Sequence, residues 1–268
     1  MGVYLEGGCF VSHISETESV ISGTLSQRNV IGAQTGAKEI SLRVLEFSKG
    51  LSPGLRADAD TVLYTLDSPD SLSCTVFIDC HASEIAPQTG LYARPGQTVA
   101  VLNKNEQPVV MISSQCPQSA KSSVVEAMTG LPDPAAPLQK FPSINLSDRA
   151  AIPTADRWYR VLVDDELGST QVTQFVGSIP PGRAPDHFHN YEEVLFILRG
   201  EGQMWAGETK TPIGPGSCIY LPRRQVHCVE NTGQGELRLL GVFYPAGSPA
   251  VRYEAQLTDP PIFTDYTD

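Results

Sequence analysis

Residues 172–200 read VTQFVGSIPPGRAPDHFHNYEEVLFILRG. An apolar run is followed here by a Pro-Pro-Gly turn, a polar loop and a second run of Val, Leu, Phe and Ile. Similar short runs recur along all 268 residues, separated by many of the 23 glycines and 21 prolines. Apolar and β-branched runs bounded by turn residues indicate short strands. We therefore expect an all-β chain, with Ser119–Met128 as its best helical segment.

The same pattern occurs earlier, as LRVLEFSKGLSPGLRADADTVLYTLD over residues 42–67. Gly54 aligns with Gly182 and Val62 with Val194, so the offset grows from 128 to 132 and the second loop is longer. ARPGQTVAVLN, from Ala93, likewise matches YLPRRQVHCVEN, from Tyr220. Two copies of one β module predict two tandem barrels. We expect an N-terminal barrel over 1–116, a linker over 117–156, a C-terminal barrel over 157–255 and a tail over 256–268.

Charge and composition narrow the class of protein. Lys and Arg number 19 against 30 Asp and Glu, giving a net charge of −11. Such an acidic surface repels phosphate backbones and anionic lipid, so we expect neither nucleic-acid nor membrane partners. The opening residues MGVYLEGGCFVSH lack the features of a signal peptide, and we expect a cytoplasmic protein. None of the six cysteines forms a Cys-x-x-Cys pair, which favours reduced thiols and leaves a Cys218–Cys228 disulfide as an alternative.

Four side chains of the second copy have the chemistry of metal ligands. His187 and His189 are two residues apart in an extended segment, so their side chains project to the same face. Glu193 follows across a short turn, and His227 can approach from the opposite wall of a barrel. Three imidazoles and one carboxylate suit one divalent transition metal ion, with Fe, Mn, Ni, Co, Cu and Zn all left open.

The segments HFHNYEEVLFILRG and GPGSCIYLPRRQVHCVEN resemble the two motifs of the cupin family. The resemblance is strong over residues 172–244 and weaker over 42–116, so the chain resembles a bicupin made of two jelly-roll barrels. It implies that His187, His189, Glu193 and His227 are the metal ligands. It also selects Glu193 over Glu192, which we expect to be a solvated strand-edge residue.

The first copy departs from this pattern at every ligand position. Its loop has LRADAD in place of the His-x-His segment, Thr61 stands at the glutamate position, and Ala100 stands at the position of His227. These side chains do not form a transition-metal site. We therefore expect the N-terminal barrel to be structural.

The substrate residues are less well defined by sequence. Gln174, Arg183, Trp205 and Tyr220 come from strands and loops expected near the metal, and we predict them as substrate-binding residues. Each could instead pack in the core or lie in solvent, because sequence alone does not decide its facing.

The resemblance implies an enzyme acting on a small organic molecule, and a dioxygenase-type oxidoreductase is the leading hypothesis. Glu193 would be a ligand that doubles as the catalytic proton acceptor. The same ion acting as a Lewis acid would support an isomerase, a decarboxylase or an aminohydrolase. A non-catalytic cupin that binds a small molecule or metal is the third hypothesis. The duplication could replace the usual cupin dimer within one chain, and a homodimer of bicupins is also left open.

Overall fold

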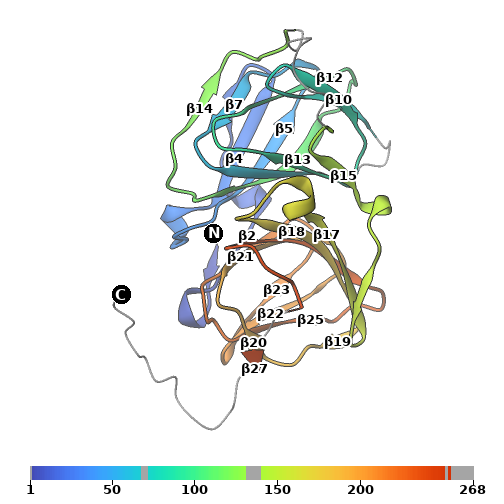
Figure 1. Cartoon of the computed structure of the whole chain (residues 1–268). Helices are drawn as coiled ribbons and strands as arrows, with labels where there is room; N and C mark the ends of the chain where they lie inside the picture. The colour runs from blue at the N-terminus through green and yellow to red at the C-terminus, as the bar shows by residue number, and fades with distance from the viewer. Residues whose placement is uncertain (1, 68–71, 131–139, 251–252, 255–268) are drawn as a thin grey trace.

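The computed structural model describes residues 2–67, 72–130 and 140–250, and the backbone of residues 253–254. Its strands form four antiparallel sheets, which build two barrels, one above the other in Figure 1. The expected all-β jelly-roll architecture is confirmed. Helical structure in the described ranges is limited to short 3-10 turns: η1 Glu6–Gly8, η2 Ile14–Glu16, η3 Ala33–Thr35, η4 Leu146–Asp148 and η5 Asp165–Leu167.

The N-terminal barrel consists of a seven-stranded and a six-stranded sheet. In spatial order, the first sheet contains β15 (Ser143–Asn145), β11 (Thr89–Ala93), β8 (Asp60–Thr65), β13 (Val109–Cys116), β5 (Leu42–Phe47), β4 (Leu25–Ile31) and β3 (Val20–Ser22). The second contains β10 (His81–Ile85), β9 (Cys74–Ile78), β12 (Thr98–Asn103), β7 (Gly54–Ala57) and β14 (Ser122–Val125), with β6 (Gly50–Leu51) paired to β12.

The C-terminal barrel has the same plan, with an eight-stranded and a six-stranded sheet. The first contains β1 (Val3–Tyr4), β2 (Phe10–His13), β24 (Ser217–Leu221), β21 (Glu192–Arg199), β26 (Leu237–Tyr244), β18 (Thr173–Ile179), β17 (Arg157–Val163) and β16 (Ile152–Thr154). The second contains β23 (Thr209–Ile213), β22 (Gly202–Ala206), β25 (His227–Asn231), β20 (His187–Phe188) and β27 (Tyr253–Glu254), with β19 (Gly182–Arg183) paired to β25.

Three apolar cores account for the burial of these strands. One fills the N-terminal barrel and one fills the C-terminal barrel. The third lies between the barrels and contains side chains of both, including Val62 and Tyr64 from one and Val176 and Phe196 from the other. Side chains alternate between the two faces of a strand. In each strand at the contact between the barrels, alternate side chains therefore point into the core of its own barrel, and the others point into the core shared with the other barrel.

The strand pairing changes the predicted domain boundaries. Strands β1 and β2 come from the first residues of the chain, yet β2 pairs with β24 of the C-terminal barrel. The predicted linker is also largely built into the sheets, because β14 pairs with β7 and β15 pairs with β11. The N-terminal barrel therefore takes strands from the expected linker, and the C-terminal barrel takes the first strands of the chain. The predicted tail, residues 256–268, lies outside the described residues.

The expected helix at Ser119–Met128 is wrong, because Ser122–Val125 form strand β14. This segment contains the pair Val124 and Val125, and an edge of the sheet at β7 provides its hydrogen-bond partners. Reduced cysteines are confirmed: all six, including Cys218 and Cys228, are free thiols. No helix within the described ranges is long and apolar enough to cross a membrane.

Candidate metal centre

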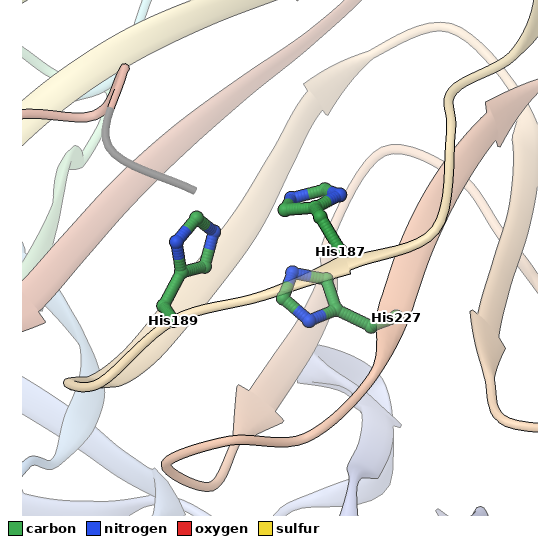
Figure 2. A group of neighbouring side chains, drawn as sticks. All are labelled: His187, His189 and His227. Carbon is green, nitrogen blue, oxygen red and sulfur yellow. The ribbon is translucent and has the colours of Figure 1, made fainter. Parts of the chain in front are cut away.

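Three histidines converge at one end of the C-terminal barrel. His187 in β20 lies directly across from His227 in β25, and His189 is the first residue after β20. Their nearest ligand nitrogens all lie within 4.8 Å of one another. Figure 2 shows the three rings facing a common point. The predicted pairing of a His-x-His segment with a histidine from another strand is therefore present in the structure.

Backbone carbonyls orient two of the imidazoles. The Nδ1 atom of His187 lies 3.0 Å from the carbonyl oxygen of Pro185, and that of His227 lies 2.8 Å from the carbonyl oxygen of Gln225. A carbonyl can only accept, so each Nδ1 donates and each Nε2 keeps its lone pair for a ligand. Burial, followed by the neighbouring His187, holds the pKa of His227 well below its usual value, so this ring is neutral at neutral pH.

Glu193 lies beside this cluster. Its Oε2 is 4.0 Å from Nε2 of His189, and its side chain is buried. Desolvation raises the pKa of Glu193 to about 8 in the metal-free protein. The compact group of ligand atoms comprises the three histidines alone. The structure thus brings Glu193 next to the group, and its role as fourth ligand stays a prediction.

Tyr191 supports His189 from one side. The two rings stack with centroids 4.6 Å apart and an interplanar angle of 10°, and Tyr191 stacks in turn on Phe243 at 4.1 Å. This aromatic contact fixes the plane of the His189 imidazole. No sequence motif marks Tyr191, although its position two residues from both His189 and Glu193 places the three side chains on one face.

The histidines open into a cavity of about 120 Å³ with mostly apolar walls. Pockets for drug-sized ligands measure about 300–1,000 Å³, so this cavity suits a small molecule. Its apolar walls include Tyr159, Phe175, Ile179, Leu195, Val229 and Leu239. Arg157 also lines it and supplies a guanidinium beside the apolar walls. We did not predict Arg157. It lies two residues from the cavity residue Tyr159 in β17, so the two side chains project from the same face of the strand.

Two of the predicted substrate residues are on the wrong face of their strands. Gln174 precedes the cavity residue Phe175 in β18, so it faces the N-terminal barrel, where a side chain at Gly90 would meet its Oε1 at 2.8 Å. Its amide finds no hydrogen-bond partner in the described structure. Tyr220 belongs to the core between the barrels. Neither side chain lines the cavity, which corrects both predictions.

The other two predicted substrate residues lie on the outside of the barrel. Trp205 alternates in β22 with the core residues Met204 and Ala206, so its ring faces outward. The Arg183 guanidinium lies over that ring at 4.1 Å and forms an ion pair with Asp186 at 3.0 Å. Both residues therefore form a surface cluster away from the cavity, and the prediction that they bind substrate is corrected.

Glu192 also differs from expectation. It is 3% exposed, and its carboxylate accepts hydrogen bonds from the backbone N–H groups of Lys38 and Glu39 and from the Tyr220 hydroxyl. Glu192 therefore connects the two barrels instead of lying at a solvated strand edge.

Comparisons with known proteins agree with this arrangement. Residues 175–243 match the Cupin domain family. Auxin-binding protein 1 of Arabidopsis thaliana is 32% identical over 83 residues, which is 27% of this chain and 42% of that protein. Auxin-binding protein T92 of Nicotiana tabacum is 32% identical over 87 residues, 28% of this chain and 46% of that protein. The chain thus matches less than half the length of these relatives.

The solved structures match over a larger part of the chain. A mutant of Bacillus subtilis oxalate decarboxylase superposes with a TM-score of 0.75 at 13% identity, over 91% of this chain and 78% of that one. A second oxalate decarboxylase structure gives a TM-score of 0.73 at 14% identity, over 91% and 78%. At this identity the match shows the fold alone.

The C-terminal barrel therefore carries the match to the Cupin domain family, and the described chain as a whole has the two-barrel fold of the oxalate decarboxylase structures. More particularly, the barrel that matches this family contains the histidine cluster. Within the described ranges, no comparable group of histidine, cysteine and carboxylate ligands lies in the N-terminal barrel. The donor set of three imidazoles fits a divalent transition metal ion.

Proposed function

We propose that the C-terminal barrel is a metal-dependent catalytic site for a small carboxylic acid, and that the reaction is a decarboxylation. The observation that carries the proposal is the convergence of three imidazoles, Glu193 and Arg157 on one small apolar cavity. His187, His189 and His227 would hold the ion, with Glu193 as the fourth predicted ligand. Fe, Mn, Ni, Co, Cu and Zn all remain open. When bound, such an ion supplies Lewis-acid chemistry at the substrate oxygens.

Arg157 gives the cavity a means of selecting carboxylates. A guanidinium matches a carboxylate with two parallel hydrogen bonds. Its side chain is 15% exposed, and its partner Asp156, 2.9 Å away, is 62% exposed. An ion pair with so exposed a carboxylate is weak, so a substrate carboxylate can replace Asp156 at little cost.

The apolar walls and Glu193 supply the remaining steps. A carboxylate placed against apolar side chains loses hydration, which favours its departure as neutral carbon dioxide. The carbon–carbon bond breaks, its electron pair stays with the remaining carbon, and that carbon takes up one proton. Glu193, the buried carboxyl group beside the cavity, can deliver this proton in its protonated form, when it is not coordinated to the ion, and then regain one from water.

Two relationships support a carboxylic acid as the ligand. The structural neighbours are oxalate decarboxylases, and the sequence relatives include auxin-binding proteins. Oxalate and auxin are both carboxylic acids. The size of the cavity favours a molecule of few atoms.

A dioxygenase is the second candidate. Three imidazole nitrogen donors leave coordination positions open for a substrate and molecular oxygen. It differs from the first proposal in one measurable respect, because it consumes oxygen in proportion to product. A third candidate, a cupin that binds a small molecule without turnover, would show saturable binding and no product.

The experiment measures carbon dioxide release and oxygen uptake on the metal-replete protein with a panel of oxalate, oxo acids, catechols and β-diketones. Decarboxylation predicts carbon dioxide release without stoichiometric oxygen uptake, and its loss in His227→Ala and Arg157→Met. Arg28→Met is the matched control, because Arg28 pairs with Glu46 in the other barrel. Turnover that is unchanged in both site variants would refute the proposal.

Cellular location and assembly are further proposals. Six free thiols support a reducing compartment such as the cytoplasm. A homodimer is supported by exposed apolar side chains on the terminal strands β1 and β3, where Tyr4 is 59% and Ile21 is 71% exposed. Light scattering on the wild type and on Ile21→Lys tests the dimer.

A further inference from the structure

The N-terminal barrel contains a second cavity, of about 160 Å³. Thr61 lines it, and in the internal repeat Thr61 aligns with Glu193 of the metal cavity. The two cavities therefore lie at corresponding ends of the two barrels. The walls of the second cavity are richer in polar side chains, among them Gln27, Asn29, Arg43, Thr61, Gln97 and Ser113.

Arg43 lies in the middle of a polar row across the sheet. It is directly opposite Asn29 of β4 on one side and Ser113 of β13 on the other. Leu45 and Phe47 lie on the same face of β5 as Arg43, and both belong to the core inside this barrel. All three side chains of the row therefore project to the inner face of the sheet, at the cavity.

The positive charge of Arg43 is not neutralised by the described protein. Its Nη2 donates to Oε1 of Gln115 at 3.0 Å, a neutral partner. Its Nε and the hydroxyl of Ser113 are buried without any hydrogen-bond partner in the described structure. Desolvation lowers the pKa of Arg43, and no charged neighbour contributes to that shift. The Arg43 side chain is partly exposed at the cavity, and a cation withdrawn from water without a counter-ion is costly, so a site of this kind is complementary to an anion.

We propose that this cavity is a binding site for a small oxyanion of the carboxylate type. In it, Nε of Arg43 and the Ser113 hydroxyl donate to the anion. Arg56, which is exposed and also lines the cavity, adds a second positive charge at the entrance. The site lies in the other barrel from the metal centre and does not depend on it. The barrel that lacks metal ligands is thereby assigned a binding role in addition to its structural one.

The test is calorimetric titration of the full-length, metal-free protein in the Arg157→Met/His227→Ala background, which removes the C-terminal cavity from the measurement. Acetate, oxalate and inorganic phosphate are the probes, in a buffer without other oxyanions. Saturable binding of a carboxylate at one site per chain is expected. Tighter binding of phosphate than of either carboxylate would overturn the carboxylate assignment.

Arg43→Met should weaken this binding by at least about tenfold, since it removes a charged donor. Ser113→Ala should weaken it severalfold. Arg28→Met is the control, because Arg28 lies on β4 and already pairs with Glu46. Absence of binding in the starting background, or equal affinity in Arg43→Met, would overturn the proposal. If Arg43→Met does not fold, Ser113→Ala and Asn29→Leu decide in the same way.

Discussion

Glu192 and Glu193 are consecutive in β21 and face opposite sides of the sheet. Glu192 points to the N-terminal barrel and accepts hydrogen bonds from the Glu39 N–H of that barrel at 2.8 Å and from the hydroxyl of Tyr220, in its own barrel, at 2.9 Å. Glu193 points into the metal cavity, 4.0 Å from His189. Two identical side chains therefore serve separate purposes, one in holding the barrels together and the other in the site. Amide substitutions should separate the two.

Glu192→Gln should lower the free energy of unfolding by about 1–3 kcal/mol, because a charged acceptor is lost and an amide N–H₂ then faces buried donors. Metal content and activity per folded molecule should stay unchanged. Urea unfolding and metal analysis measure the two effects. Equal stability of this variant and the wild type would contradict the role of Glu192 at the interface.

Glu193→Gln should raise the free energy of unfolding of the metal-free protein. The pKa of Glu193 in the folded protein, about 8, lies above its ordinary value of 4.5. Its contribution to the free energy of unfolding is therefore fully present below about pH 4.5 and is lost as pH rises through 8. The glutamine has no charge to bury. The variant should therefore gain about 2–4 kcal/mol relative to wild type between pH 5 and pH 9. A stability difference that does not change with pH would contradict the burial of this carboxyl.

Metal removal should lower thermal stability, because three ligands from two strands and a loop are tied to one ion. A ligand at 100 times its Kd stabilises the folded state by about 2.7 kcal/mol. We expect chelation to lower the Tm of the wild type and to leave His227→Ala unchanged. His13→Ala, outside the cluster, is the control. An equal effect of chelator on the wild type and on His227→Ala would refute the assignment.

Tyr191 should act on metal affinity through His189. Outer partners of metal ligands typically change affinity by about 10–100-fold when lost. Tyr191→Ala removes the stacked ring and should weaken metal binding within that range, whereas Tyr191→Phe keeps the ring and should bind as the wild type does. Competition with a chromophoric chelator gives both values. Equal weakening in the two variants would point to the hydroxyl instead of the stacking contact.

Gln174→Met should leave turnover unchanged, in keeping with its place between the barrels. Its amide is buried without a partner in the described structure, and methionine has a similar shape with no amide to satisfy. We expect a gain of about 1 kcal/mol in the free energy of unfolding. A loss of activity in the folded variant would restore Gln174 as a substrate residue.

The sequence predicted the histidine cluster well because strand alternation is a local rule. His187 and His189 share a face for the same reason that Tyr191 and Glu193 do. The prediction of the substrate residues failed because strand alternation shows which residues share a face but does not show which face points inward. Gln174 and Phe175 differ by one position, and only the contact with the second barrel decides between them. Arg157 was missed because its strand had no motif to draw attention to it.

The domain boundaries failed for a different physical reason. Internal repeats locate units of similar pattern, but strands at sheet edges can pair with partners far away in the chain. β2 and β24 are separated by about two hundred residues, and no local signal links them. Ser122–Val125 likewise forms a strand because the free edge of β7 accepts it.

The pairing of β2 with β24 bears on how the protein is made. Strand β2 is synthesised about two hundred residues before its partner β24. Until β24 is made, a segment containing Phe10 and Val11, both buried in the finished molecule, has no sheet to join. If the gene were divided between the two repeats, β1 and β2 would be on the N-terminal fragment, separate from the C-terminal barrel to which they belong. The C-terminal half expressed alone would then expose the edge of β24 and its unsatisfied backbone groups to other molecules.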